Sequence, residues 1–196
     1  MAFLMAAALL WVVGLAFFRS HRIWVFYFPW GAVGLTLLLI LFLRGSPVEY
    51  HLERATALLL QQVMGLLSIP ASVFDRAAGM VLVFIEAEKS WTALGIDIEC
   101  SGLLESCVFL GLVFFYPAFS LPKRIFYAST GILAIYLINL LRLCTIVFLI
   151  NACGRQAIYL AHTLAGRLVF FFLIVALYWA IFSRPTLAAL RGHLHD

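Results

Sequence analysis

Residues 125–150 read IFYASTGILAIYLINLLRLCTIVFLI, a run of 26 residues in which Arg142 is the only charged side chain. A transmembrane helix needs about 20 consecutive apolar residues at a rise of about 1.5 Å per residue. The run is therefore long enough to cross a bilayer. An arginine inside hydrocarbon is costly, so Arg142 is a candidate functional residue that faces a cavity or a partner.

Four other segments are apolar over a similar length, so the chain is predicted to cross the membrane about five times. They are residues 1–18, 23–43, 101–119 and 157–182. The first can also be read as a signal peptide, but no basic residue precedes its apolar part, and Arg19 and Arg22 follow it. We therefore expect a retained helix.

The composition excludes an ordinary soluble domain. Of the 196 residues, 65% are hydrophobic and 11% charged, with a mean hydropathy of +1.09, whereas soluble domains average about 45–50% apolar and about 25% charged residues. Hydrocarbon offers no partner to unpaired backbone groups, which leaves helices and closed barrels. Barrel strands alternate apolar and polar residues, and the runs at 31–43 and 168–182 do not. We predict an all-α polytopic bundle that forms a single membrane domain over residues 1–196.

The distribution of Lys and Arg predicts the orientation of the bundle. With the N-terminus outside, the inner segments 19–22, 120–124 and 183–196 hold six basic residues and one acid. The long outer loop, residues 44–99, holds four basic residues and seven acids. Basic loops remain on the inner side of membranes. We therefore expect a multi-pass protein of the cell membrane with its N-terminus outside and its C-terminus inside.

The outer loop is predicted to contain secondary structure of its own. Residues 51–68 carry apolar side chains at helical spacing, and we expect this helix to lie on the membrane surface. The spaced residues are Leu52, Ala55, Leu59, Val63 and Leu66. Residues 80–85 and 94–98 are short and rich in β-branched residues, so they could form a hairpin whose second strand runs straight into Cys100.

In this topology Cys100 and His162 lie in the same half of the membrane as Arg142. Cys100 lies at the outer mouth of the third span, His162 roughly 8 Å below the start of the fifth, and Arg142 roughly 13 Å below the outer end of the fourth. Their side chains can meet there, in a site that faces outside. A cysteine at a helix N-terminus gains thiolate character from the helix dipole and from nearby cations. A histidine can take and return a proton, and an arginine can stabilise an oxyanion. The alternatives are a packing role for Cys100 and a structural hydrogen bond for His162.

The sequences around these three residues resemble a known family. Glu99–Cys100–Ser101–Gly102, then Asn139–Leu140–Leu141–Arg142, then His162 with Gly166, follow one another at the outer ends of successive spans. In this order they resemble the exosortase/archaeosortase family of membrane transpeptidases, over residues 80–182. Many relatives have more spans, so the chain resembles a compact variant.

The resemblance implies an enzyme in which Cys100 is the nucleophile, His162 the general acid/base and Arg142 the transition-state stabiliser. It implies that the substrate is a membrane-anchored exported protein with a C-terminal sorting signal. That signal consists of a short motif, a transmembrane helix and a basic cluster. The signal is cleaved off, and the protein is transferred to a surface acceptor, for which a lipid or a glycan is a candidate.

Four further residues are supporting candidates, namely Ser101, Asn139, Glu105 and Arg167. Glu105 could neutralise Arg142 or Arg167, because buried ions need partners, or these charges could line a wet cavity separately. The same charges define the rival hypothesis, a non-enzymatic transporter or assembly factor with an ion or anion pathway.

The sequence predicts neither a cofactor nor a metal site. The four cysteines, Cys100, Cys107, Cys144 and Cys153, show no zinc-type spacing. The basic residues are scattered along the chain, so we expect no nucleic-acid partner. The sequence leaves the oligomeric state open.

Overall fold

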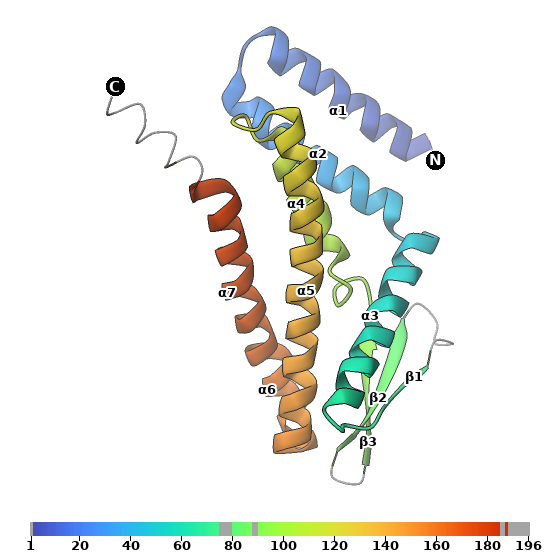
Figure 1. Ribbon diagram of the computed structural model, residues 1–196. Helices are drawn as coiled ribbons and strands as arrows, with labels where there is room; N and C mark the ends of the chain where they lie inside the picture. The colour runs from blue at the N-terminus through green and yellow to red at the C-terminus, as the bar shows by residue number, and fades with distance from the viewer. Residues whose placement is uncertain (1, 75–79, 88–89, 185–186, 188–196) are drawn as a thin grey trace. The chain divides into compact units, whose positions relative to one another are not determined.

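The computed structural model describes residues 2–74, 80–87, 90–184 and 187 of the chain (Figure 1). It divides into two compact units, of which the first comprises Met1–Ser46 and Leu104–Leu133 and the second Pro47–Leu103 and Ala134–Asp196. The single membrane domain stays a prediction. Most of the C-terminal segment that the sequence places inside lies outside the described residues.

The apolar segments form helices at the predicted positions. Three helices are long and apolar enough to cross a membrane, namely Trp24–Leu43, Leu121–Cys153 and Ile158–Ser183, and two shorter apolar helices cover Met5–Ser20 and Leu103–Phe115 within the described part of the chain. The predicted class, a polytopic helical membrane protein, is therefore confirmed. The third predicted span is shorter than expected, because Pro117 disfavours a helical conformation at Tyr116 and α4 (Leu103–Phe115) ends there.

In the first unit, helices α1 (Ala2–Ser20) and α2 (Trp24–Leu43) form a helical hairpin. Two tryptophans, one on each helix, join the helices by hydrogen bonds. The indole N–H of Trp11 donates to the carbonyl of Trp30 at 3.2 Å, and that of Trp30 donates to the carbonyl of Trp11 at 3.1 Å. Gly34 and Gly14 face the two rings, so any larger residue at either position would collide with an indole. The reciprocal bonds satisfy both N–H groups where hydrocarbon offers no partner.

Helix α5 (Leu121–Cys153) starts in the first unit, just after α4. Pro122 suits the first turn of a helix, where the missing N–H would have no partner. The guanidinium of Arg124 donates to the carbonyls of Phe119 at 3.0 Å and Tyr116 at 3.3 Å, which ties the connection to the helix.

The second unit combines α3 (Pro47–Leu66) with a three-stranded antiparallel sheet in the order β1-β2-β3. The strands are β1 (Ala71–Phe74), β2 (Val81–Ala87) and β3 (Ser90–Ile96), and α3 packs along the sheet (Figure 1). The predicted hairpin is therefore present as β2 and β3. β1 was not predicted. β3 ends at Ile96 rather than at 98, so the prediction that a strand runs straight into Cys100 is wrong.

Helix α3 buries a different face from the one that its leucines indicated. The fully buried side chains are Glu53, Thr56, Ala57, Leu60 and Met64. Of the predicted stripe, Ala55 is exposed and Leu66 is 85% exposed, whereas the other three residues are half-buried and one of them, Val63, packs against the core. The difference arises because α3 packs on a sheet that the sequence only partly predicted. The position of α3 at the membrane surface stays a prediction.

The other helices described in the second unit follow the sheet in the chain. They are the part of α5 from Ala134 onward, then a 3-10 turn (Arg155–Ala157) and a long helix over Ile158–Ser183. That helix consists of α6 (Ile158–Leu160), a π-helical turn (Ala161–Ala165), α7 (Gly166–Tyr178) and a second π-helical turn (Trp179–Ser183). Gly166 lies directly against Ile146 of α5, which allows the two helices to approach closely.

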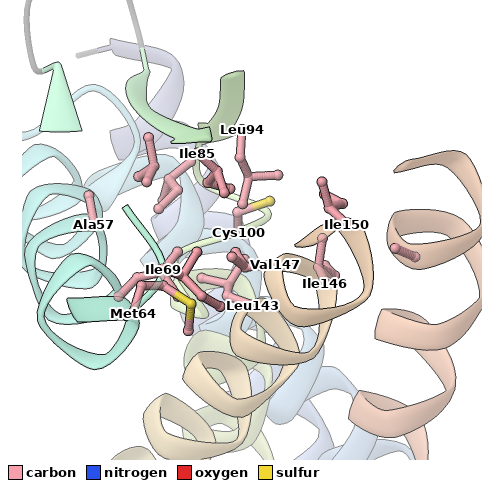
Figure 2. Close-up of a cluster of buried hydrophobic side chains, with 14 of the residues drawn as sticks. Ala57, Met64, Ile69, Ile85, Leu94, Cys100, Leu143, Ile146, Val147 and Ile150 are labelled. Atoms are coloured by element: carbon pink, nitrogen blue, oxygen red, sulfur yellow. The ribbon is translucent and has the colours of Figure 1, made fainter. Parts of the chain in front are cut away.

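The core of the second unit joins the sheet to α3 and α5. It contains Met64 of α3, Ile85 and Leu94 of the sheet, and Val147 of α5, all less than 5% exposed. Figure 2 shows Cys100 within this cluster, between the strands and α5. The candidate nucleophile thus belongs to the packed core of its unit.

Candidate active site

A turn, residues 98–102, carries Cys100 from β3 to the first residue of α4. Asp97 starts this turn: its side-chain Oδ1 accepts hydrogen bonds from the N–H groups of Glu99 and Cys100, each at 3.1 Å. The main-chain carbonyl of Asp97 also accepts from the Cys100 N–H, at 3.0 Å. An aspartate can offer main-chain N–H groups this alternative to a strand ladder. The bonds explain why β3 ends at Ile96.

The second half of the turn is held by Ser101 and Gly102. The Ser101 hydroxyl donates to the carbonyl of Ile98 at 3.0 Å and accepts from the N–H of Leu103 at 3.4 Å. Gly102 has a φ of +78°, a conformation that side chains with a Cβ rarely adopt. A Cβ there would also lie 3.4 Å from the Cβ of Asn139. The sequence Cys-Ser-Gly therefore suits both the turn and the close approach of α5.

Two residues of α5, one turn apart, bind consecutive carbonyls of this turn. The amide Nδ2 of Asn139 donates to the carbonyl of Cys100 at 2.6 Å, and Nη2 of Arg142 donates to the carbonyl of Glu99 at 3.3 Å. The guanidinium carbon of Arg142 also lies 5.3 Å from the centre of the Phe170 ring on α7, within cation–π range. The structure thus places Cys100, Ser101, Asn139 and Arg142 together.

Two polar atoms beside Cys100 remain without a hydrogen bond. Within the described ranges, the buried Oδ1 of Asn139 and the buried Nε of Arg142 have no hydrogen-bond partner. Each unpaired buried polar atom costs about 1–3 kcal/mol. An unpaired buried polar group in a native structure calls for an explanation, and a catalytic role is one of those.

The Cys100 thiol is buried, with only 6% of the residue exposed. Burial raises the pKa of the thiol, the positive charge of Arg142 lowers it, and the carboxylate of Asp97 raises it again. Burial outweighs Arg142, so the pKa lies above its ordinary value. The expectation that the thiol gains thiolate character at the helix start is therefore wrong for this structure. The sequence alone did not show that the thiol would be buried.

His162 lies in the π-helical turn Ala161–Ala165 and is half-buried. Its neighbour Ala161 belongs to the same core cluster as Cys100. Among the residues that the structure describes, no hydrogen bond links the imidazole to Cys100 or Arg142. A π-helical turn is rare and often found at functional sites, but the catalytic role of His162 stays a prediction.

The two charged supporting candidates lie on α4 and α7. Arg167 is exposed on α7. Glu105 belongs to the first unit, in the first turn of α4, so its pairing with Arg142 or Arg167 stays a prediction. In the described part of the chain, no three His, Cys, Asp or Glu side chains gather as ligands for a metal ion.

Asp97 and Phe170 contact the site, but neither was expected from the sequence. The spacing Asp97-x-x-Cys100 is a recognisable signal, because aspartate side chains often bind main-chain N–H groups two or three residues later. Phe170 gives no comparable signal, since it is one of many aromatic residues in an apolar helix.

Glu53 is a third residue that the sequence did not single out. It lies on α3, is only 4% exposed, and has its pKa raised to about 7, mainly by burial and further by the negative charges of Glu49 and Asp97. An acid with such a pKa makes the stability of the fold depend on pH.

Glu53→Gln should remove this dependence. In the unfolded chain Glu53 ionises above about pH 4.5, whereas the folded protein keeps the proton until about pH 7. The stabilisation is complete below pH 4.5, is lost as the pH rises to about 7, and then stays level, for a total of at most about 3 kcal/mol. We expect the apparent unfolding midpoint of the wild type, followed by tryptophan fluorescence, to fall across this window and that of Glu53→Gln to fall less. The matched control is Glu99→Gln, an exposed acid, which should keep the wild-type slope. Equal slopes for all three proteins would contradict the prediction.

Comparison with known proteins identifies the family of the chain. No curated protein and no solved structure matches the sequence. The family model described as transmembrane exosortase matches residues 1–179 of the 196. The match confirms the family resemblance and extends it to the N-terminal helices, so the chain belongs to the transmembrane exosortase family.

Proposed function

We propose that the protein is a membrane cysteine transpeptidase that cleaves the C-terminal sorting signal of a membrane-anchored exported protein and transfers that protein to a surface acceptor. Exosortases act on exported substrates with such signals, which gives the substrate class. The observation that carries the proposal is the position of Arg142, whose Nη2 binds the carbonyl just before Cys100. A nucleophile and a permanent positive charge thus lie side by side.

In the proposed reaction, the sulfur of Cys100 attacks the carbonyl carbon of the scissile peptide bond after its proton passes to His162. A carbon–sulfur bond forms, and the carbonyl oxygen takes the negative charge. Collapse of this intermediate breaks the carbon–nitrogen bond, and His162 returns its proton to the leaving amine. The products are a thioester on Cys100 and the released transmembrane segment.

Arg142 is the proposed donor to the oxyanion. In serine proteases the main-chain N–H of the nucleophile contributes to the oxyanion hole. Here the N–H of Cys100 already donates to Asp97, so it is not available for that role. The Nε of Arg142, which has no hydrogen-bond partner among the described residues, is a donor that an oxyanion could use.

The thioester is resolved by an acceptor nucleophile, such as an amine or hydroxyl of a lipid or glycan. That nucleophile attacks the thioester carbonyl, a new bond to the exported protein forms, and the thiol of Cys100 is regenerated. Water would give simple hydrolysis instead. The proposed site faces the outer side of the cell membrane, where such acceptors are found.

The proposal is tested by trapping the thioester. The full-length protein would be co-expressed with an exported protein that ends in a motif, a transmembrane helix and a basic cluster, then purified at acidic pH. We expect mass spectrometry to find a substrate-derived adduct on Cys100 that neutral hydroxylamine removes. An unmodified Cys100 in cells that process the substrate would contradict the proposal. It would favour the rival, a transporter or assembly factor built on Arg142, Arg167 and Glu105.

A further inference from the structure

Asp97 and Asn139 fix the two peptide groups on either side of the Cys100 Cα. Before it, the Cys100 N–H is held by the carboxylate of Asp97 at 3.1 Å. After it, the Cys100 carbonyl is held by Asn139 at 2.6 Å. Because each peptide group is planar, a hydrogen bond to one of its atoms restricts the orientation of the whole group. The two contacts therefore restrict φ and ψ at Cys100 and with them the direction of its Cα–Cβ bond.

The carboxylate of Asp97 also faces the sulfur electrostatically. It raises the pKa of the Cys100 thiol, through its negative charge and by accepting a hydrogen bond from the side chain, whereas the charge of Arg142 lowers that pKa. Glu53 on α3 is another acid close to Asp97, and its pKa is raised mainly by burial and further by the Glu49 and Asp97 charges. Glu99 lies two residues after Asp97 in the same turn. On the α6–α7 side lie the half-buried His162 and the ring of Phe170.

We propose that Asp97 is a positioning residue for Cys100, whose carboxylate fixes the turn that presents the sulfur and places a negative charge close to it. This inference rests on the proposed function, in which Cys100 is the nucleophile. The Asp97 side chain is given two effects, a geometric one on the turn and an electrostatic one on the Cys100 thiol. Two substitutions separate these effects. Asparagine retains the Oδ1 acceptor and removes the charge. Alanine removes both and leaves the Cys100 N–H only the main-chain carbonyl of residue 97 as an acceptor.

The electrostatic effect is tested by alkylation of Cys100 with iodoacetamide across a range of pH, in membranes without substrate. Mass spectrometry of the peptide that spans residues 90–123 separates Cys100 from Cys107 in its fragment ions. We expect the Asp97→Asn profile to shift to lower pH than the wild-type profile, because the thiolate no longer faces a negative charge. An unchanged profile would overturn this part of the inference. Glu49→Gln, which removes an acid from α3 outside the turn, should match the wild type.

The geometric effect is tested by the rate of substrate processing. We expect Asp97→Ala to lower kcat by about 10- to 100-fold with little change in KM, because a nucleophile displaced by about 1 Å loses up to about 100-fold in rate. Asp97→Asn should recover most of that loss, since it keeps the acceptor for both N–H groups. Equal rates for Asp97→Ala and the wild type would overturn this part.

The two proposals fail in different ways. If Cys100→Ala still processes substrate, the proposed function is wrong. If Cys100→Ala is inactive while both Asp97 variants match the wild type in alkylation and in rate, the role of Asp97 alone is wrong. If Asp97→Ala fails to fold, the alkylation profile of Asp97→Asn still decides the electrostatic effect. The kcat of Asp97→Asn, compared with that of the wild type, still tests whether the retained Oδ1 acceptor holds the turn.

Discussion

Replacement of Cys100 by alanine should abolish substrate processing. Removing the nucleophile of a catalytic unit costs about 10⁶-fold in kcat in a well-studied serine protease, and here no other residue in the turn carries a thiol. Cys100→Ser should be nearly as inactive, because a hydroxyl is a far weaker nucleophile without a strong base. The measurement is the conversion of full-length substrate to its cleaved form in membranes, at equal levels of enzyme.

The matched control for this prediction is Cys153→Ala. Cys153 is exposed at the end of α5, and we expect its replacement to leave processing unchanged. Since Cys100 is part of the buried core, a loss of activity counts only if the unfolding midpoint of Cys100→Ser stays near that of the wild type. A folded Cys100→Ser protein that processes substrate at the wild-type rate would contradict the nucleophilic role.

The helices could be predicted from the sequence because their signal is local. A run of 26 residues with a single charged side chain is long enough to cross the bilayer whatever its neighbours are, and α5 extends only a few residues beyond the run at either end. The sheet was only partly predictable. β1 has four residues and forms only by pairing with β2, and pairing between distant residues is not encoded in a short segment itself.

The candidate site was predictable in its composition but not in its geometry. Cys100 and Arg142 stand out in the sequence, since one lies at a helix start and the other inside hydrocarbon. The hydrogen bond that brings Arg142 to the turn of Cys100 runs to the carbonyl of Glu99, 43 positions earlier in the chain. It depends on the packing of α5 against the turn. The pKa of Cys100 was expected in the wrong direction for the same reason, because burial is a property of the packed unit.

Arg142→Lys should lower kcat by about 100- to 1000-fold with little change in KM, the loss expected when one donor to an oxyanion is removed. Lysine keeps the positive charge but presents a compact ammonium instead of a planar fork of donors. It can replace the bond to the carbonyl of Glu99 or donate to the oxyanion, but it cannot do both from two fixed positions. Arg142→Gln, which also loses the charge, should be less active still. The assay is the same conversion of substrate, followed under single-turnover conditions.

Arg124→Lys is the control that separates catalysis from stability. Arg124 lies near the other end of α5 and, like Arg142, donates to main-chain carbonyls, those of Phe119 and Tyr116. If arginine is required only to hold the chain next to a membrane helix, both lysine variants should lose stability and neither should lose kcat. Arg142 differs in leaving its Nε buried without a hydrogen bond in the part of the chain that the structure describes, at a cost of about 1–3 kcal/mol. This Nε is the donor that the proposed oxyanion would use, so we expect kcat to fall in Arg142→Lys alone. Equal kcat in Arg142→Lys and the wild type would show that Arg142 only holds the turn.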